Sequence, residues 1–332
     1  MLGAPLIDRY GRKIESMRIS VTDRCDLRCF YCIPGEEIEW LPREELLTLE
    51  EMARLSRIAA ECGVRKLRIT GGEPLLRRNL DALIRSLAAI EGIDSLALTT
   101  NATSLAKRAD SLYAAGLERV NISLDSLRPE TFFRLARRDR LDQVLAGIDA
   151  AAAAGMRPIR INTVPIRGIN DDEILDFVEM ARERDFECRF IEFMPLERGA
   201  TWGPDRMIPG AELRERISEV HAIVADESIH PSQPSRDYRF ADGAPGKVGF
   251  IDAVSQPFCR QCNRIRLTAD GKIRTCLFSI DEIDLIGPLR AGASDEELAC
   301  IFHAAVARKE QKHHISDGLF IKPDRTMSAI GG

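Results

Sequence analysis

The sequence lacks a long hydrophobic run. No stretch of about 18 or more consecutive apolar residues occurs in its 332 residues, so no segment is expected to span a membrane. The segment Met1–Glu15 carries several charged side chains and no apolar stretch, so it does not have the pattern of a signal peptide. We therefore expect a cytoplasmic protein that has no membrane partner.

Neither sign of charge is in large excess. The 47 basic and 52 acidic side chains give a formal net charge of −5. Because broad nucleic-acid binding draws its affinity from many cations that neutralise phosphates, this balance argues against a nucleic-acid partner. A small anionic substrate remains compatible with it, since cations can cluster locally. The hydrophobic fraction of 45% and the charged fraction of 30% are typical of a folded globular protein.

Short β-rich runs alternate with longer amphipathic segments between Ser16 and Met194. Six strand–helix units in series predict a parallel sheet with right-handed crossovers. Because a closed TIM barrel has eight such units, six favour an α/β fold with a partial (β/α)6 TIM-like barrel. Thr48 and Asn170 precede acidic residues and are expected to cap the next helices. The expected strands are Met17–Val21, Lys66–Thr70, Ser95–Thr100, Arg119–Leu124, Ile159–Val164 and Cys188–Phe193, and the expected helices are Leu49–Cys62, Leu80–Ile90, Leu105–Ala114, Leu141–Ala154 and Asp171–Arg184.

The last third of the chain has a different pattern. Asp270-Gly271 separates two short β-like runs and is a strong hairpin signal. We expect a smaller antiparallel β layer here, followed by a helix at Asp295–Ala307. The chain is expected to divide into residues 1–225 and 226–332, and the two parts should pack closely because no low-complexity linker separates them. The β-like runs are Asp237–Phe240, Lys247–Val254, Asn263–Thr268 and Lys272–Cys276.

Three of the nine cysteines form a motif directly after the first expected strand. Cys25-Asp-Leu-Arg-Cys29-Phe-Tyr-Cys32 has the spacing C-x3-C-x2-C. In a cytosolic chain, clustered cysteines are more often metal ligands than disulfides. Three thiolates in one loop can hold an iron–sulfur cluster and leave one iron of a four-iron cluster open. A structural zinc site would need a fourth ligand, which is missing nearby, and three ordinary buried cysteines are the other alternative.

A second triplet lies near the C-terminus. Cys259-Arg-Gln-Cys262 is followed by Cys276, which suggests a second metal centre with three thiolate ligands. A zinc hairpin is the alternative, because His303, His313 or His314 could supply a fourth ligand. Arg264 and Arg266 lie two residues apart in an expected strand, so their guanidinium groups share a face. Two such groups suit a polyphosphate, unless this face only meets solvent.

Cations also occur within the other expected strands. Lys66 and Arg68 repeat the spacing of two, and Arg18, Arg160 and Arg189 lie in three further strands. A cation that faces the inside of a barrel needs a counter-charge, since an unpaired buried charge is costly. Several of them together indicate an anion with several charges. Each one taken alone could equally be ion-paired within the barrel.

These motifs resemble a known superfamily of proteins and, more closely, one family within it. The first cysteine loop, Tyr31 and Gly71-Gly72-Glu73-Pro74 resemble the radical S-adenosylmethionine (SAM) superfamily. The second cysteine triplet, the run Cys262-Asn-Arg-Ile-Arg266 and the terminal Gly331-Gly332 narrow the likeness to the GTP 3′,8-cyclase family. The resemblance extends from about Ile7 to Gly332 and is looser around Thr201–Ala244.

The resemblance implies two [4Fe-4S] clusters and S-adenosyl-L-methionine as cofactors. Cys25, Cys29 and Cys32 would hold the radical-generating cluster, and Cys259, Cys262 and Cys276 a second cluster whose open iron meets the guanine base. The tail Gly331-Gly332 is implied to enter the active site. The implied contacts to SAM are Tyr31, Gly72, Ser123 and Met194. The implied contacts to GTP are Arg18, Arg68, Thr99, Arg160, Arg264 and Arg266, with Lys66 and Arg189 as supporting cations.

Two positions depart from the family's pattern. Members commonly have lysine where Arg160 stands, and a planar guanidinium does not replace an ammonium in every contact. Thr326 stands where the family often has proline, and we expect this change to matter little.

The solitary Cys62, Cys188 and Cys300 are expected to be buried apolar residues.

The implied reaction starts from a 5′-deoxyadenosyl radical that abstracts hydrogen from C3′ of GTP. Attack of the C3′ radical on guanine C8, followed by reduction, gives 3′,8-cyclo-7,8-dihydro-GTP, and this reaction is the first step of molybdenum cofactor biosynthesis. The implied partners are an electron donor such as flavodoxin and the downstream cyclic pyranopterin monophosphate synthase, and the chain could form a homodimer.

Two alternatives stay open. Another radical SAM enzyme with an auxiliary cluster, for example a peptide-modifying one, usually carries more C-terminal cysteines. A zinc or iron–sulfur module that carries electrons or docks a partner would not explain the inward-facing cations.

Overall fold

The computed structural model describes residues 1–33, 38–196, 202–228, 232–315 and 320–331. Its strands are β1 (Ser16–Ser20), β2 (Lys66–Thr70), β3 (Ser95–Thr100), β4 (Arg119–Ser123), β5 (Ile159–Thr163), β6 (Glu187–Ile191), β7 (Ile223–Ala225), β8 (Arg236–Phe240), β9 (Lys247–Ile251), β10 (Arg264–Leu267), β11 (Lys272–Arg274) and β12 (Ile283–Asp284). Within the described residues these strands form one sheet in the order β12-β11-β10-β1-β2-β3-β4-β5-β6-β9-β8-β7. The run from β1 to β6 is parallel throughout, which confirms the expected partial barrel.

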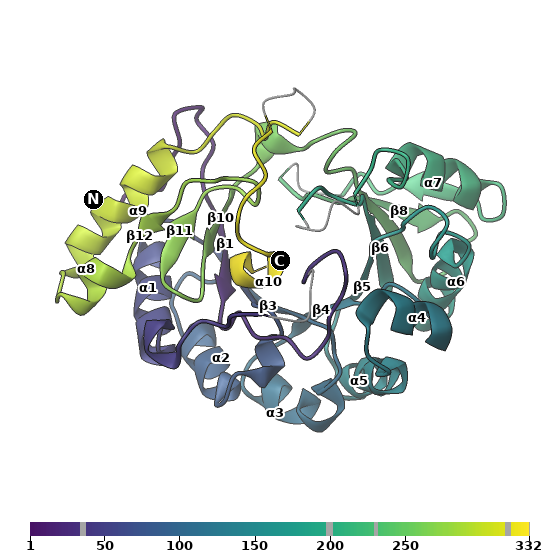
Figure 1. Ribbon diagram of the computed structural model, residues 1–332, viewed down its shortest axis with the longest axis horizontal. Helices are drawn as coiled ribbons and strands as arrows, with labels where there is room; N and C mark the ends of the chain where they lie inside the picture. Colours follow the sequence, from purple (N-terminus) through teal and green to yellow (C-terminus); the bar gives the residue numbers. More distant parts are fainter. Residues whose placement is uncertain (34–37, 197–201, 229–231, 316–319, 332) are drawn as a thin grey trace.

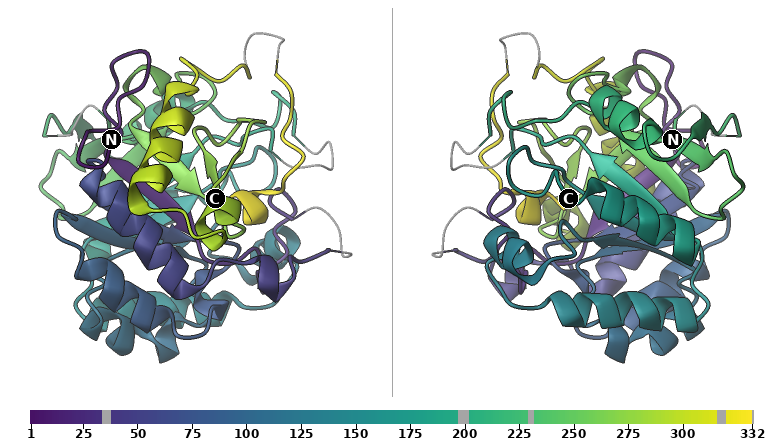
Figure 2. Two further views of the ribbon diagram at one scale, coloured as in Figure 1. Left: turned by 90° about the vertical axis from the view of Figure 1, so that its left-hand side faces the viewer. Right: turned by 90° about the vertical axis from the view of Figure 1, so that its right-hand side faces the viewer.

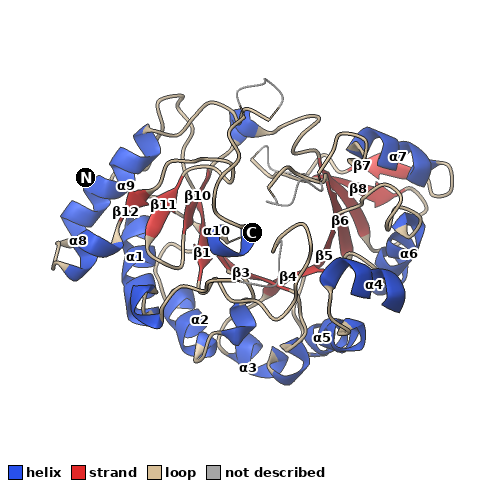
Figure 3. Cartoon of the chain, in the orientation of Figure 1, coloured by secondary structure: helices blue, strands red, loops and turns tan. Residues whose placement is uncertain are grey.

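Helices cover the outer side of the curved sheet (Figure 1, Figure 3). The two side views in Figure 2 show this outer layer, with purple and blue helices on one side and teal helices on the other. The short α10 lies on the concave side, near the middle of the view in Figure 1. The helices are α1 (Leu49–Glu61), α2 (Leu80–Ala88), α3 (Ala109–Ala114), α4 (Pro129–Ala136), α5 (Leu141–Ala153), α6 (Ile174–Arg184), α7 (Gly210–Ser218), α8 (Ile286–Arg290), α9 (Asp295–Ala307) and α10 (Met327–Ile330).

Alternate residues of the inner strands face opposite sides of the sheet. In β1, Met17 and Ile19 are fully buried in the apolar core that the sheet shares with the outer helices. Arg18, between them, points to the concave side, and β2 repeats this pattern around Arg68. The apolar residues therefore fix the sheet against the helices, while the polar ones are left to form a site.

The C-terminal strands extend the same sheet on both edges. β9 pairs in parallel with β6, and β10 pairs in parallel with β1. The expected antiparallel pairing is present further out, where β8 and β7 follow β9 and where β11 and β12 follow β10. The expected division after residue 225 falls between β7 and β8, which pair with each other, and it stays a prediction.

Two helix caps were predicted, and one is confirmed. The Thr48 hydroxyl accepts a hydrogen bond from the Glu51 backbone N–H at 3.1 Å, and the Glu51 carboxylate accepts one from the Thr48 N–H at 2.7 Å. The Asn170 prediction is wrong, because α6 begins only at Ile174. The Asn170 amide instead donates to the carbonyls of Asp125 at 2.7 Å and Val164 at 3.0 Å. The Asn170 side-chain oxygen, which a cap would use as acceptor, accepts from the Ile166 backbone N–H at 2.7 Å instead.

The solitary cysteines are not all buried. Cys62 and Cys188 lie in the core as expected, but Cys300 is exposed on α9, where the prediction is wrong. The pattern of α9 alone did not determine which of its faces meets the sheet. No helix in the described residues is long and apolar enough to cross a membrane.

Candidate active site

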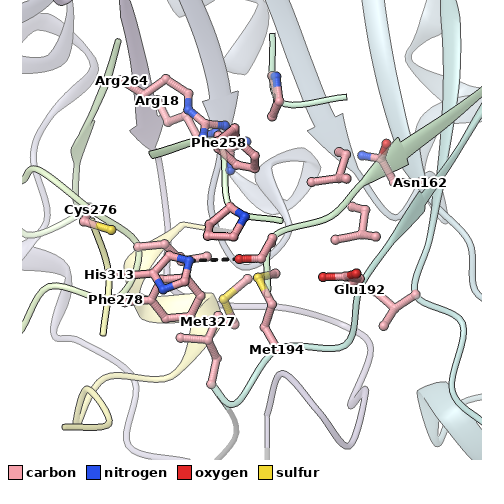
Figure 4. A pocket seen from close by; sticks show the side chains of 18 of the residues that line it. Arg18, Asn162, Glu192, Met194, Phe258, Arg264, Cys276, Phe278, His313 and Met327 are labelled. Carbon is pink, nitrogen blue, oxygen red and sulfur yellow. Dashed lines mark hydrogen bonds between the residues drawn. The ribbon is translucent and has the colours of Figure 1, made fainter. Parts of the chain in front are cut away.

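A cavity lies on the concave side of the sheet, at the carboxyl ends of the parallel strands. Ser123 is the last residue of β4, Thr99 is the last but one of β3, and both line this cavity. Figure 4 shows part of it, with Cys276, Phe278 and His313 on one side and Asn162 and Glu192 on the opposite side. This is the end of a barrel at which TIM-type enzymes carry their chemistry.

Most residues singled out from the sequence lie around this one cavity. They come from the parallel strands, from the loop after β6 and from the C-terminal strands, so distant parts of the chain meet here. Asp125 and Asn162, which the sequence analysis did not single out, also line the cavity, and both follow the same signal of a polar residue at a strand end. The predicted residues that line it are Arg18, Tyr31, Arg68, Thr99, Ser123, Arg189, Met194, Cys259, Cys262, Arg264, Arg266 and Cys276.

Three arginines form a row across neighbouring strands. Arg266 of β10 is in register with Arg18 of β1, which is in register with Arg68 of β2. Neighbouring strands lie about 4.8 Å apart, so the row spans roughly 10 Å. Arg18 and Arg68 form no ion pair or hydrogen bond with any residue that the structure describes. Burial and the neighbouring Arg18 lower the pKa of Arg68 well below its ordinary value, because the charged form is poorly compensated.

The other predicted cations are compensated or lie elsewhere. Arg160 donates to the Glu187 carboxylate at 2.6 Å and does not line the cavity. Arg189 does line it, but its guanidinium bonds Glu187 at 2.9 Å and Asp237 at 3.0 Å. Lys66 is exposed at the first residue of β2, away from the carboxyl end. Arg160 and Arg189 are therefore neutralised by the protein itself, whereas Arg18 and Arg68 have no ion-pair partner among the described residues.

The first cysteine triplet lies in the loop after β1. All three thiols are free and half-buried. Burial raises the pKa of Cys29, and the negative charges of Asp125, Cys32 and Cys25 raise it further, so these groups are near one another. Three thiolates that repel in this way need positive charge among them, as the iron of a cluster supplies. The donor set therefore fits an iron–sulfur cluster.

Gly72 holds this loop in place through a close backbone contact. Its backbone N–H donates to the Thr22 carbonyl at 2.7 Å. A Cβ at Gly72 would lie 2.3 Å from the Arg24 carbonyl oxygen and 2.4 Å from that of Asp23. Main chain cannot move away as a flexible side chain can, so a larger residue here must displace the segment that leads into Cys25.

We expect Gly72→Ala to lower the iron content of the first cysteine site and to destabilise the protein by about 1–3 kcal/mol, as overpacking of a tight contact does. Gly287→Ala is the matched control, because a Cβ there meets only the far end of the Asp284 side chain. Iron analysis and thermal unfolding of both variants measure the effect. Equal iron content in Gly72→Ala and Gly287→Ala would contradict this role.

Tyr31 connects the first cysteine loop to the end of β4. Its hydroxyl donates to the Asp125 carboxylate, and Asp125 also accepts from the Val164 backbone N–H at 2.8 Å. Burial raises the pKa of Asp125 to about 6, although these hydrogen bonds oppose the rise. The Tyr31 ring also meets the Phe193 ring edge-on, with centroids 6.4 Å apart. The aromatic side chain is thus fixed at the cavity wall.

The second cysteine triplet lines the cavity directly. Cys259 interacts electrostatically with Cys262 and Cys276, so the three thiols lie together. The Arg264 guanidinium stacks 4.6 Å from the centroid of the Phe258 ring and donates to the Cys262 sulfur at 3.8 Å. Although burial opposes it, the charges of Arg264 and Lys309 lower the pKa of Cys262 to about 6. The site therefore favours a thiolate, which is the form that binds metal.

Of the candidate zinc ligands, His313 lies beside this triplet, where its backbone N–H meets the Cys259 sulfur and its side chain lines the same cavity. The His313 ring bonds the Ala253 carbonyl at 2.9 Å, and the His303 ring lies 3.2 Å from the Met1 carbonyl. In the part of the chain that the structure describes, no three His, Cys, Asp or Glu side chains are arranged to hold a single metal ion.

The C-terminal tail reaches the row of arginines. The Gly331 carbonyl accepts a hydrogen bond from the Arg266 guanidinium. Gly331 has a φ of +83°, and a Cβ there would lie 2.8 Å from that of Ser20. The Ser328 backbone N–H meets the Cys32 sulfur. The tail thus lies between the first cysteine loop and the arginines, while Gly332, the other predicted tail residue, lies outside the described residues.

Comparison with known proteins identifies the family. Residues 19–181 match the Radical SAM superfamily, and residues 186–315 match Molybdenum Cofactor Synthesis C. GTP 3′,8-cyclase of Moorella thermoacetica is 47% identical over 325 residues, covering 98% of this chain and 99% of its own length. GTP 3′,8-cyclase of Syntrophomonas wolfei is 46% identical over 98% of this chain and 100% of its own length.

Solved structures of lower similarity share the fold. Streptococcus suis SuiB aligns with a TM-score of 0.61 at 16% identity, over 89% of this chain and 67% of its own length. The structure of SuiB bound to S-adenosylmethionine aligns with a TM-score of 0.57 at 17% identity, over 81% of this chain and 62% of its own length. The similarity to the cyclases extends over nearly the whole of both chains, and this chain belongs to the GTP 3′,8-cyclase family of the radical SAM superfamily.

Proposed function

We propose that this protein converts GTP to 3′,8-cyclo-7,8-dihydro-GTP, the first step of molybdenum cofactor biosynthesis. The observation that carries the proposal is that the arginine row and the second cysteine triplet line one cavity, with the first cysteine triplet in the adjacent loop. An electron carrier has no need of the arginines. A plain nucleotide-binding protein has no need of the cysteines.

The arginine row is the proposed binding site for the triphosphate. Arg18 and Arg68 have no partner among the described residues, so an anion gains their full charge without first breaking an ion pair. Each guanidinium can donate two parallel hydrogen bonds to phosphate oxygens. At the Arg266 end of the row, Arg264 lies next to Cys262 of the second cysteine triplet. Thr99 adds a hydroxyl on β3, the strand next to β2. This order would put the phosphates on the arginines and the base near the cysteines.

Two iron–sulfur clusters are the proposed cofactors, together with SAM. Each triplet offers three thiolates, which leaves one iron of a [4Fe-4S] cluster free to bind another ligand. Cys25, Cys29 and Cys32 would hold the first cluster, which would supply the one electron that cleaves SAM into methionine and the 5′-deoxyadenosyl radical that takes hydrogen from C3′ of GTP. Cys259, Cys262 and Cys276 would hold the second cluster, which would supply an iron as Lewis acid for the guanine base.

The chain's own contribution is to bind and orient. Tyr31, Gly72, Ser123 and Met194 are the proposed contacts to SAM, next to the first cysteine loop. Because positioning alone can supply several kcal/mol of the barrier, rigid placement at strand ends is the main requirement. The tail residues Gly331 and Gly332 are proposed to complete the site and help to exclude water.

The remaining predicted cations have secondary roles in this proposal. Arg160 and Arg189 are compensated by Glu187, so we propose that they support the positive potential of the site rather than clamp a phosphate. Lys66 contributes only long-range charge, which solvent screens. An electron donor such as flavodoxin, the downstream synthase and a homodimer stay predictions.

The product made from GTP tests the function. Anaerobically reconstituted and reduced protein is incubated with GTP and SAM, and the products are identified by mass spectrometry and NMR. We expect equal amounts of 5′-deoxyadenosine and cyclised nucleotide, since one radical is used for each ring closure. Formation of 5′-deoxyadenosine that GTP does not stimulate, with no cyclised nucleotide, would refute the proposed substrate. Nothing in the described residues favours the alternative function, a peptide-modifying radical SAM enzyme.

A further inference from the structure

A buried lysine lies behind the second cysteine triplet. Lys309 lies two residues after the end of α9 and is only 2% exposed. Its Nζ donates to the Arg264 carbonyl at 3.1 Å and also to the Thr275 carbonyl. Thr275 immediately precedes Cys276, and Arg264 lies two residues after Cys262. One ammonium group therefore links the two chain segments that carry these cysteines.

The charge of Lys309 has no carboxylate partner within the described residues. Two carbonyl oxygens satisfy its hydrogen bonds but do not neutralise it. Because a buried charge without a counter-charge is very costly, another negative group should lie within reach. Lys309 interacts electrostatically with Cys259 and Cys262, and its charge favours the thiolate form of each. The lysine and the cysteine triplet thus compensate each other.

The segment that bears Lys309 is tied to the same cysteine loop from outside. The Arg12 guanidinium donates to the Cys259 carbonyl at 2.6 Å, and also to the carbonyls of Gln311 at 3.1 Å and Glu310 at 2.6 Å. Asp8 orients this guanidinium by accepting from its Nε at 2.5 Å. Lys309 is therefore held at a fixed place relative to the triplet, and its charge acts from a constant distance.

We propose that Lys309 is a positioning residue that sets the reduction potential of the cluster at Cys259, Cys262 and Cys276 through its buried positive charge. The proposal rests on the proposed function, because it requires that second cluster. A nearby positive charge stabilises the reduced, more negative form of a cluster, and net charge is one of the factors that set these potentials. Water does not screen the effect, because the ammonium is buried.

Removal of this charge should shift the reduction equilibrium about tenfold toward the oxidised form. For one electron, a tenfold change is about 59 mV, so the midpoint potential should fall by about that amount. Lys309→Met removes both the charge and the hydrogen bonds. Lys309→Gln keeps an amide donor without the charge, and Lys309→Arg keeps the charge. The three variants together distinguish charge from scaffolding.

The measurement is a redox titration of the full chain with both clusters loaded, followed by electron paramagnetic resonance. The signal of the second cluster is assigned by comparison with Cys29→Ala, which should lack the first. Lys312→Met is the matched control, because Lys312 is on the same segment but exposed. We expect a lower potential in Lys309→Met and Lys309→Gln, and wild-type potentials in Lys309→Arg and Lys312→Met.

The outcomes separate this inference from the proposed function. A wild-type chain that binds only one cluster would defeat the two-cluster proposal itself. A second cluster that loads normally in Lys309→Gln at an unchanged potential would overturn the inference, because the lysine would then act only through hydrogen bonds. An equal shift in Lys312→Met would overturn it as well, since overall charge would be the cause. If Lys309→Met does not bind the second cluster, the midpoint potential measured in Lys309→Gln still tests the inference.

Discussion

Cys29→Ala is expected to abolish the formation of 5′-deoxyadenosine from SAM. Cys29 lies at the centre of the first triplet, where burial and the charges of Asp125, Cys32 and Cys25 raise its pKa. Two remaining thiolates would leave the cluster without one of its three protein ligands, and a four-iron cluster ligated in this way is not expected to persist. Product analysis by chromatography gives the yield, and iron and sulfide analysis gives the cluster content. We expect about half of the wild-type iron, all of it in the second site.

The counterpart in the second triplet should behave differently. Cys276→Ala is expected to keep some cleavage of SAM but to lose the cyclised nucleotide, because the substrate and not the radical source depends on this site. Cys300→Ala is the control for loss of a thiol as such, since Cys300 is exposed on α9 and belongs to neither triplet. Normal 5′-deoxyadenosine formation by Cys29→Ala would refute the first assignment. Full cyclisation by Cys276→Ala would refute the second.

Local features of the site could be predicted from the sequence. The two cysteine motifs and the glycines after β2 depend on spacing within a few residues, and spacing is visible in a sequence. The strands β2 and β3 were predicted to the residue, because each is a short β-rich run between clear helical segments. Arg18, Arg68 and Arg266 were singled out as polar residues within such runs, and they do share one face.

Contacts between distant segments could not be predicted in the same way. β9 and β10 extend both edges of the parallel sheet, and no local pattern tells which edge a strand will join. The pairing of Arg160 and Arg189 with Glu187 depends on the register of β5 and β6 and on the choice of side-chain rotamers. The contact of Lys309 with the segments of the second cysteine triplet could not be predicted either, because a lysine after a helix end is usually exposed.

Arg68→Met should weaken GTP binding and at the same time stabilise the free protein. Arg68 has no partner among the described residues, and burial together with Arg18, Arg189 and Arg160 disfavours its charged form. Each lost hydrogen bond to a phosphate costs about 1.5–3 kcal/mol, so the affinity for GTP should fall about tenfold or more. Methionine fills similar space without charge. We expect the free energy of unfolding of the ligand-free variant to rise by about 1 kcal/mol, since apolar replacement of poorly compensated charge is often stabilising.

Thermal unfolding with and without GTP should therefore reverse the order of the two proteins. Without ligand, Arg68→Met should melt about 2 °C above the wild type. With GTP in excess, the melting temperature of the wild type should rise by more than that of Arg68→Met, because stabilisation by a ligand grows with the ratio of its concentration to Kd. Arg160→Met is the matched comparison: Arg160 already pairs with Glu187 at 2.6 Å, so this variant should lose stability without ligand. A lower melting temperature for ligand-free Arg68→Met, together with unchanged GTP affinity, would show that Arg68 supports the fold and does not bind the triphosphate.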